Sequence, residues 1–561
     1  MKKGLLFFLL ALLLLAAGAP FLWLYGRPAY HRYKEQRFLR RAQAYAAQGD
    51  VRNAWLSAQQ TLRLNTNNVV ACRILAQIAG AAGLPTELDW RRRVAQLDPT
   101  LDNRLALAAT ALRRQRPPCA LAAETLEAMA GTAEKVAAYH VLAAELALKL
   151  NELARAETHF RRAATLEPTN RAPELNLAVL RLSATNDSTA RTARATLEGL
   201  APDATLGATA LNWLVSDSLR RDDLAAATLY SGRLQHHPGA QIQDRLQWLD
   251  LLQRTQSREL PAALAALQNR SATNAVEVHE VSAWMVRHDL PTPALQWLRG
   301  LPAPVQTRQP TPVAIVECLL VLQDWGEIRA GLKETAWNDL EFLRQAFLSK
   351  ASRELKEAVA AEGQWRNAVR EAGLRLGALN ALLDLTRHWG RTEEREALLW
   401  AIAEHFPRER WALRELDEFY QAAGNTRGMN RVYATELSYD PKNHFLRNNL
   451  AATSLLLNHN PAEAAAMARA LHEERPTDPV VVTTYAFALY KLGRTAEARQ
   501  ILEQLPPDQL QTPGVATYYA ILLAGSGETN KALTYVPLAR RSALLPEEAT
   551  LLDKLENRPT R

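Results

Sequence analysis

The chain has 561 residues, of which 48% are hydrophobic and 22% charged, with 24 glycines and 28 prolines. This balance fits a folded helical protein and excludes a disordered chain, a collagen-like fibre and a turn-rich β-sandwich. Basic residues exceed acidic ones by eight, and the one dense basic run, over residues 27–41, follows an apolar segment. Because a membrane-flanking role explains this run, we expect no nucleic-acid partner. Three cysteines, far apart and odd in number, exclude a disulfide framework and a cysteine-based zinc site.

The first predicted element is a single membrane span over residues 4–25, which carry no charge. As a helix this run would be about 33 Å long, enough to cross the hydrocarbon core of a bilayer. Trp23 and Tyr25 close it as interfacial aromatic residues. The alternative is a cleaved signal peptide that ends at Ala19. We favour an uncleaved anchor, because Pro20 would be the first mature residue and the apolar run continues beyond it.

The orientation of this span is open to two interpretations. The positive-inside rule, applied to the basic residues that follow the span, would keep the large domain in the cytoplasm. The short tail with Lys2 and Lys3 is instead typical of chains that retain their amino end inside, and long domains translocate largely regardless of charge. We therefore expect a single-pass membrane protein with an extracytoplasmic, periplasmic domain.

From residue 34 onward the sequence predicts one helix after another, and residues 137–170 show the pattern best. Ala144 and Ala156 would let two antiparallel helices approach closely, and Phe160 would fill the space beside them. Pro168 would end the second helix.

The same markers recur along the chain at intervals of 34 residues. The pairs are Gly390 with Gly424, Pro407 with Pro441, and Gly493 with Gly527. The pattern resembles the tetratricopeptide repeat, a 34-residue helix–turn–helix unit in which these glycines would occupy the turn between the helices. The resemblance implies an all-α fold: a right-handed superhelical solenoid of helix–turn–helix repeats after one N-terminal transmembrane helix.

The markers divide the chain into four predicted parts. Residues 1–33 would be the transmembrane anchor and its basic flank, 34–238 an N-terminal array, and 376–561 a C-terminal array. Residues 239–375 remain helical but lose the markers. Degenerate repeats or an inserted domain would explain them, and we expect degenerate repeats.

Motifs for catalysis are missing from the sequence. It contains no phosphate-binding loop, no dinucleotide-binding turn and no nucleophile elbow. His279 and Glu280 begin a zinc-protease motif, but Ala283 stands where the second histidine is needed. We therefore expect no enzyme, cofactor or metal site. Tryptophans at helical spacing beside leucines are expected to fill the core between helices: Trp90, Trp213, Trp248, Trp284 and Trp297.

The resemblance also implies that the first helix of each pair lines a concave groove, through the same positions in every repeat. Carried over residue by residue, it indicates as binding residues Asn380, Asp384, Arg387, Arg414, Glu418, Phe487, Tyr490 and Lys491, with Glu145, Lys149 and Trp411 at equivalent positions. Such a mixed polar, charged and aromatic surface suits an extended peptide or a partner helix.

These features predict a membrane-tethered scaffold for protein–protein interaction. It would bind a peptide or partner protein in its groove during the assembly of a bacterial envelope complex, and would contact the membrane through residues 4–25. The alternative is a regulatory or substrate-presenting subunit of a separately encoded enzyme. A homo-oligomer is possible in both cases.

Overall fold

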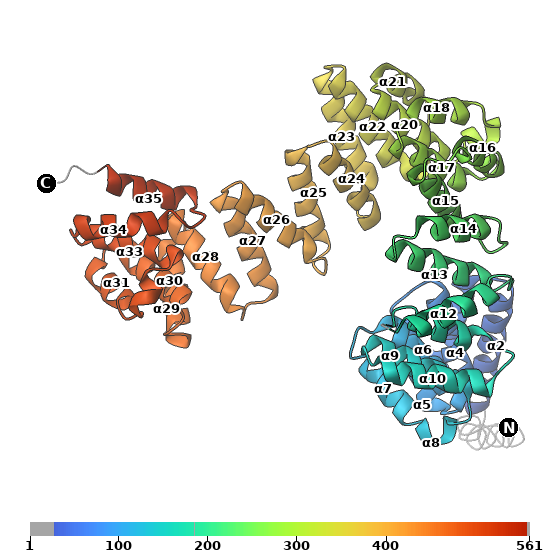
Figure 1. Cartoon of the computed structure of the whole chain (residues 1–561). Coiled ribbons are helices and arrows are strands. Elements are labelled where there is room, and N and C mark those ends of the chain that lie inside the picture. The colour runs from blue at the N-terminus through green and yellow to red at the C-terminus, as the bar shows by residue number, and fades with distance from the viewer. Residues whose placement is uncertain (1–26, 185, 558–561) are drawn as a thin grey trace, which may run out of the picture. The chain divides into compact units, whose positions relative to one another are not determined.

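The computed structural model describes residues 27–184 and 186–557, which form helices joined by turns and contain no strand (Figure 1). The predicted membrane span over residues 4–25 lies outside these described residues. Within them, no helix combines the length and the apolar composition that crossing a bilayer requires.

Two compact units make up the chain: residues 1–288 with 297–311, and residues 289–296 with 312–561. The first seventeen helical segments of the described chain are α2 (Arg27–Ala47), α3 (Val51–Leu64), α4 (Val69–Ala81), α5 (Glu87–Leu97), α6 (Leu101–Arg114), α7 (Ala120–Glu127), α8 (Ala130–Ala133), α9 (Ala137–Lys149), α10 (Leu153–Leu166), α11 (Ala172–Arg181), α12 (Asp187–Leu200), α13 (Gly207–Arg220), α14 (Leu224–Gln235), α15 (Ile242–Arg254), α16 (Leu260–Ser271), α17 (Ala275–Arg287) and α18 (Pro291–Arg299). They are followed by α19 (Ala303–Gln306), α20 (Thr311–Leu322), α21 (Trp325–Lys333), the 3-10 turn η2 (Asn338–Leu340), α22 (Glu341–Glu354), α23 (Ala358–Ala372), α24 (Leu376–His388), α25 (Thr392–His405), α26 (Trp411–Ala422), α27 (Thr426–Tyr439), α28 (His444–Leu456), α29 (Pro461–Glu474), α30 (Pro479–Lys491), α31 (Thr495–Leu502), α32 (Pro507–Leu510), α33 (Pro513–Gly525), α34 (Thr529–Ala539) and α35 (Pro546–Glu556).

The pair α9 and α10 shows how the repeated residues build a helix pair. Ala144 of α9 and Ala156 and Ala163 of α10 are completely buried, and the Phe160 ring is buried beside them. Alanine has no side-chain atom beyond Cβ, so the two helices can lie close together while the phenyl ring fills the remaining volume. The predicted roles of Ala144, Ala156 and Phe160 in packing are confirmed.

The turn inside most pairs of the described chain contains a residue with positive φ, which ends the first helix. Gly390, Gly424, Gly493 and Gly527 have φ values of 65°, 61°, 79° and 87°, which confirms their predicted place in the turn. Glycine is favoured there because it has no Cβ to collide with the preceding carbonyl.

The same turn continues through residues 239–375, where the sequence markers are lost. Its positive-φ residues are Asp222, Gln256, Asp289, Gln323 and Lys356, followed by Gly390, at intervals of 33 or 34 residues. Around Gln256, the Ser257 N–H reaches back to the Leu252 carbonyl at 2.8 Å, which closes the helix end. The 34-residue period therefore runs through this region, with non-glycine residues in the left-handed conformation.

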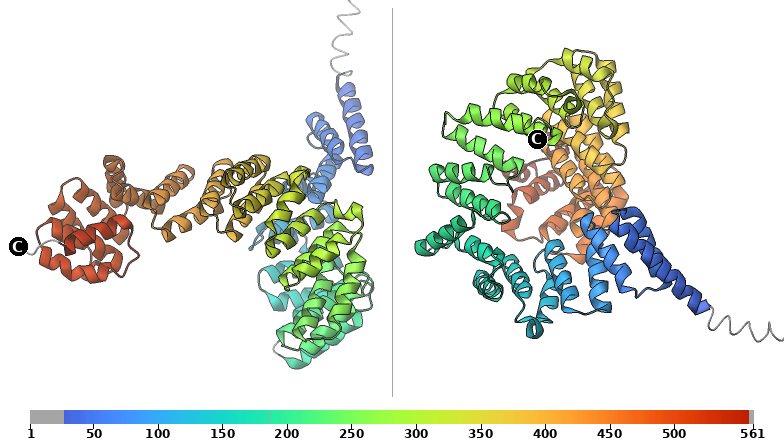
Figure 2. Two further views of the ribbon diagram at one scale, coloured as in Figure 1. Left: turned by 90° about the horizontal axis from the view of Figure 1, so that it is seen from above. Right: turned by 90° about the vertical axis from the view of Figure 1, so that its right-hand side faces the viewer.

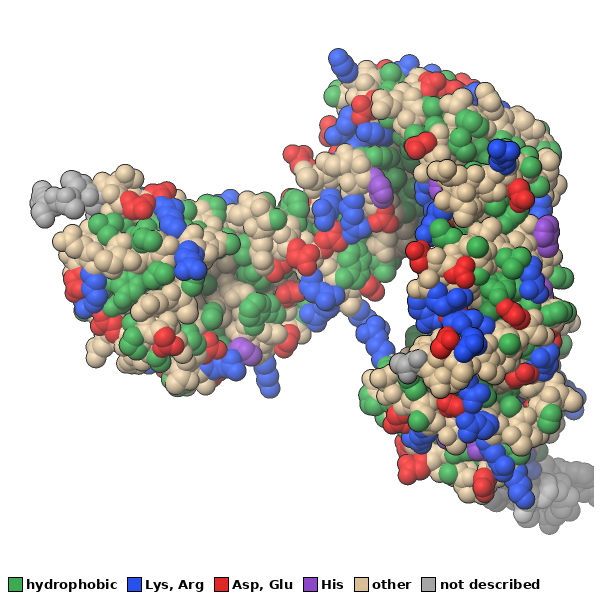
Figure 3. All heavy atoms as spheres, in the orientation of Figure 1, with side chains coloured by type: hydrophobic (Ala, Val, Ile, Leu, Met, Phe, Trp, Pro, Cys, Tyr) green, Lys and Arg blue, Asp and Glu red, His purple; other side chains and the backbone are tan. Residues whose placement is uncertain are grey.

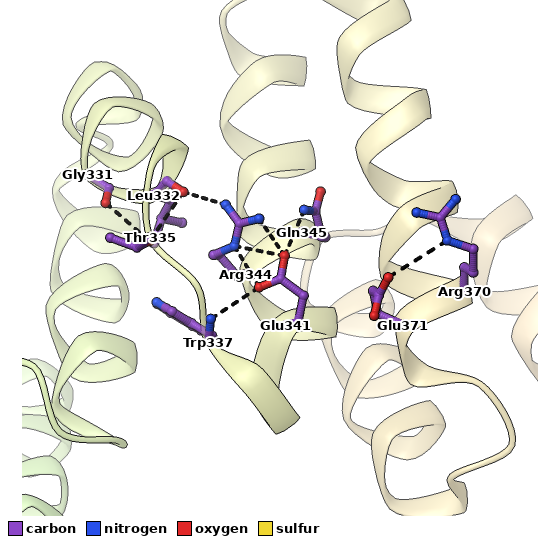
Figure 4. Close-up of polar contacts among 9 residues, drawn as sticks. All are labelled: Gly331, Leu332, Thr335, Trp337, Glu341, Arg344, Gln345, Arg370 and Glu371. Carbon is purple, nitrogen blue, oxygen red and sulfur yellow. Dashed lines mark hydrogen bonds and ion pairs between the residues drawn. The ribbon is translucent and has the colours of Figure 1, made fainter.

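Glu341 organises the irregular connection between α21 and α22 (Figure 4). Its carboxylate accepts hydrogen bonds from the Arg344 guanidinium, the Gln345 amide at 3.0 Å and the Trp337 backbone N–H at 3.2 Å. Arg344 also donates to the Leu332 carbonyl at the end of α21. These hydrogen bonds, that of Arg344 first, lower the pKa of Glu341 to about 2.

Candidate functional site

The first helices of three successive pairs, α9, α11 and α13, surround a cavity of about 570 Å³ in the first unit. We call the surface formed by the first helices of successive pairs the first-helix face. The cavity is lined by Glu145, Leu148, Phe160, Asn176, Val179, Leu180, Leu182, Ser183, Trp213, Ser216, Asp217 and Arg220. Glu145 was predicted to lie in the groove, and the structure places it here.

The wall of this cavity is largely apolar and accessible. Trp213 is 44% exposed and Leu148 39% exposed, and Val179 and Leu180 lie between them on α11. The prediction that Trp213 fills the core is wrong, because Leu211 and Leu214 take the buried positions of α13 and leave the indole on the cavity side. The prediction is right for Trp284, which is buried.

Charged groups stand at the edge of the same cavity. Asp217 is buried and accepts hydrogen bonds from Arg194 at 2.7 Å, Arg220 at 2.7 Å and Arg221 at 3.0 Å. Glu145 has no such partner in the described chain, and burial in the concavity raises its pKa. An apolar side chain with a neighbouring cationic group would match this arrangement.

A second cavity, of about 380 Å³, lies on the first-helix face of α24 and α26 in the second unit. It brings together four predicted residues, Arg387, Arg414, Glu418 and Trp411, with Arg395 and Glu415. Arg395 and Glu415 were not predicted, because they fall outside the repeat positions that the resemblance singles out.

Glu415 links the arginines of this second cavity. It accepts hydrogen bonds from Arg387 at 2.5 Å and from Arg395 at 2.7 Å, and Arg387 also pairs with Asp384 at 2.6 Å. The hydrogen bond with Glu415 raises the pKa of Arg387. Arg414 forms no ion pair within the described residues and is exposed, which leaves its guanidinium available. Asn380 is half-buried on α24 and does not line this cavity.

The remaining predicted residues lie on α30, and the structure corrects one of them. Phe487 is only 1% exposed and belongs to the core between α28, α29 and α30, so it cannot act as an exposed anchor. Tyr490 is half-buried and stacks on Phe487 with ring centroids 6.1 Å apart. Lys491 is half-buried as well, and this burial lowers its pKa.

A segment of the chain itself covers this part of the first-helix face. Leu545 and Leu551, just before and within α35, pack against the core cluster that contains Phe487 and Tyr490. Thr426, at the start of α27, donates a hydrogen bond to Glu547 of α35. Sequence spacing could not indicate this contact, which joins residues 121 positions apart.

On the face seen in Figure 3, basic and acidic side chains are interspersed, with hydrophobic side chains between them. Within residues 27–184 and 186–557, no three histidine, cysteine, aspartate or glutamate residues lie close enough to hold a metal ion.

Comparisons with known proteins identify one part of the chain. The tetratricopeptide repeat family matches residues 455–534. Among solved structures, Naa15/Naa10 bound to HypK-THB is 15% identical, with 93% of this chain and 77% of that chain covered and a TM-score of 0.26. The APC/C hetero-tetramer Cut9–Hcn1 is 12% identical, with 94% and 99% covered and a TM-score of 0.23. No curated protein matches the chain. The matched residues, 455–534, run from the end of α28 into α34.

Proposed function

We propose that this protein is a membrane-tethered scaffold that binds a partner polypeptide on its first-helix face and has no enzymatic activity of its own. The observation that carries this proposal is the cavity between α9, α11 and α13, with Trp213 and Leu148 exposed in its wall. A soluble surface rarely leaves a tryptophan beside leucine and valine in a hollow unless a ligand covers them. Buried aromatic anchors of this kind carry most of the energy of protein interfaces.

The kind of partner is suggested by α35. This short helix presents Leu551, Leu552 and Leu555 to the repeats, and its first turn contributes Glu547 and Glu548 to polar contacts. A partner segment with apolar side chains at helical spacing would bind the open cavity of the first unit in the same way. We propose that such a segment belongs to a component of a bacterial envelope assembly.

The membrane tether is supported by the distribution of charge. Residues 27–63 contain eight lysines and arginines but only two acids, which gives +6 of the chain's net +8. Most of this excess lies on α2, which begins immediately after the apolar segment and extends well beyond α3 (Figure 2). Each such cation near an anionic lipid surface contributes about 1 kcal/mol of attraction. We propose that residues 4–25 span the membrane. The proposal that the repeats lie on its periplasmic side rests on the short tail with Lys2 and Lys3 and not on this basic flank.

A pull-down from detergent-solubilised membranes tests the scaffold. The full-length protein, tagged at its carboxy terminus, is compared with the double variant Trp213→Ala/Leu148→Ala. We expect recovery of the partner to fall at least tenfold, since a buried anchor contributes about 2 kcal/mol or more. The matched control is Leu153→Ala/Leu229→Ala, which removes two exposed leucines from the second helices α10 and α14.

Three results would count against this assignment. Equal recovery with both double variants would place the interface elsewhere. A co-purified enzyme whose activity depends on this chain would favour the regulatory-subunit alternative, and recovery of only a second copy would indicate self-association.

Deletion of residues 1–26 keeps α2 whole and should release the protein from membranes in high salt. Retention there would contradict the tether.

A further inference from the structure

A third cavity, of about 370 Å³, lies between α14, α15 and α16 in the first unit and contains a concentration of cationic groups. Its polar lining consists of Gln235 and His236 at the end of α14, Arg245 and Trp248 on α15, and Arg270 on α16. Leu249, Ala263, Ala266 and Leu267 complete it. No carboxylate lines the cavity.

Arg245 is the unusual group in this cavity. The residue is only 6% exposed, and its Nε–H has no acceptor among the described residues. The neighbouring acids have other partners. Asp244 accepts hydrogen bonds from Asn212 at 3.0 Å and from the Gln241 N–H at 2.7 Å, and Glu277 accepts one from Ser271 at 3.1 Å.

The other two buried arginines of the described chain show what normally compensates such a charge. Arg344 pairs with the carboxylate of Glu341. Arg391 donates to Ser349 at 3.3 Å, lies over the Trp389 ring at 4.9 Å and is 4.0 Å from the Glu394 carboxylate, although one of its terminal nitrogens has no acceptor among the described residues. Arg245 forms no ion pair and no cation–π contact within the described residues, although the charges of Glu277 and Asp244 lie near enough to act on it. A buried guanidinium N–H without an acceptor is costly, and an anion bound in the cavity would supply that acceptor.

The surrounding charges point in the same direction. Burial lowers the pKa of Arg245 and the nearby positive charge of Arg270 lowers it further, while the charges of Glu277 and Asp244 act in the opposite direction without cancelling the shift. Arg270 is exposed at the edge and forms no ion pair within the described residues. His236 also lines the cavity, and its Nε2 accepts a hydrogen bond from the Gln235 side-chain amide at 2.6 Å. The donors that face a ligand are therefore the two guanidinium groups, in a lining that contains no carboxylate.

We propose that this cavity binds an oxyanion, a carboxylate or a phosphate group, between Arg245 and Arg270. A guanidinium offers two parallel N–H donors that match the oxygen spacing of both groups. Trp248 and the apolar residues of α15 and α16 would accommodate the carbon skeleton that carries the anion. The site lies away from the α9–α11–α13 cavity and does not depend on the scaffold function.

Isothermal titration of the full-length protein in detergent tests the site, with three probes at fixed ionic strength: inorganic phosphate, acetate and phenyl phosphate. We expect saturable binding of at least one probe to the wild type. Arg270→Gln should weaken it about tenfold, because a hydrogen bond to a charged group is lost. The matched control is Arg254→Gln, an exposed arginine of α15 outside the cavity, which should bind like the wild type.

The probes also separate the sources of the anion. Tighter binding of phenyl phosphate than of inorganic phosphate would support a ligand with an apolar body, and tighter binding of acetate would support a carboxylate. Absence of saturable binding for all three probes would overturn the proposal. Equal weakening by Arg254→Gln and Arg270→Gln would overturn it too, because the effect would then be one of general charge.

The thermal stability of the Arg245→Met variant gives a second, independent test of the anion site. In chloride buffer we expect this variant to melt at a higher temperature than the wild type, because an unpaired buried charge has been replaced by an apolar side chain. Saturating probe should then stabilise the wild type and leave the variant unchanged. Stabilisation of the variant by the same probe would show that the anion binds elsewhere and would overturn the assignment.

Discussion

The hydroxyl of Tyr518 in α33 donates a hydrogen bond of 2.5 Å to the carboxylate of Glu548 in α35. Burial raises the pKa of Tyr518 well above 10, and the charge of Glu548 adds to this effect, so the phenol stays protonated as a donor. The contact attaches the last helix to the first helix of the last pair. Leu552 and Leu555 of α35 pack in the same core cluster as α33 and α34, so α35 covers this pair.

Loss of this contact should loosen α35 without unfolding the repeats. Glu548→Ala removes the acceptor of Tyr518 and the bond that caps α35 at Leu545. A hydrogen bond to a charged group contributes about 1.5–3 kcal/mol, so amide exchange in residues 546–556 should be at least tenfold faster. Hydrogen-exchange mass spectrometry measures this. Asp553→Ala, which breaks only an exposed pair with Arg540, should change little; equal effects of the two variants would contradict the assignment.

Ala156 should tolerate no enlargement, because it is completely buried between α9 and α10. Overpacking usually costs about 1–3 kcal/mol, and an indole at this position should exceed that range. Denaturant unfolding of Ala156→Trp is compared with Ala154→Trp, whose site on the same helix is exposed. A loss below about 1 kcal/mol for Ala156→Trp would mean that the helix pair can separate easily.

Glycine in place of a non-glycine residue at positive φ should stabilise the protein. A non-glycine residue in the left-handed conformation costs about 1–2 kcal/mol of folding free energy. Substitution by glycine removes this cost, although part of the gain is lost because glycine has more conformational entropy in the unfolded chain. Gln323→Gly/Lys356→Gly should therefore raise the thermal midpoint. The converse variant, Gly424→Val, should lower it, because a Cβ there would also stand 3.4 Å from Pro546. A fall with the glycine pair would show that those side chains have contacts that outweigh the strain.

Glu341 should make the second unit sensitive to acid. Its folded pKa of about 2 lies below the ordinary value of 4.5, so the stabilisation is present above pH 4.5 and is lost as the pH falls towards 2. The shift corresponds to about 3 kcal/mol. Glu341→Gln should be less stable than the wild type at pH 7, and the difference should vanish near pH 2. Glu362→Gln, an exposed acid of α23, serves as the control in acid titrations followed by circular dichroism.

Several features of the fold follow from residues close together in the sequence. Alanines at Ala144 and Ala156 and glycines at Gly390 and Gly424 predict helix pairs and turns, because helix packing and left-handed turns impose their requirements within a few residues. The sequence also brought Arg387, Arg414 and Glu418 into one predicted set, which the structure gathers around one cavity. Equivalent positions on successive first helices lie on one side, so a period alone can group them.

Tertiary structure decided the features that depend on distant neighbours. Phe487 and Trp213 both occupy first helices, yet one is covered by α35 and surrounding helices while the other opens into a cavity. The period through residues 239–375 was hidden because Gln256, Gln323 and Lys356 can adopt positive φ when helix packing on both sides requires it. Arg245 forms no ion pair because the carboxylates of Asp244 and Glu277 accept hydrogen bonds from Asn212 and Ser271 instead. A local pattern specifies the helix pair, but burial and charge pairing are settled by chain segments that meet only after folding.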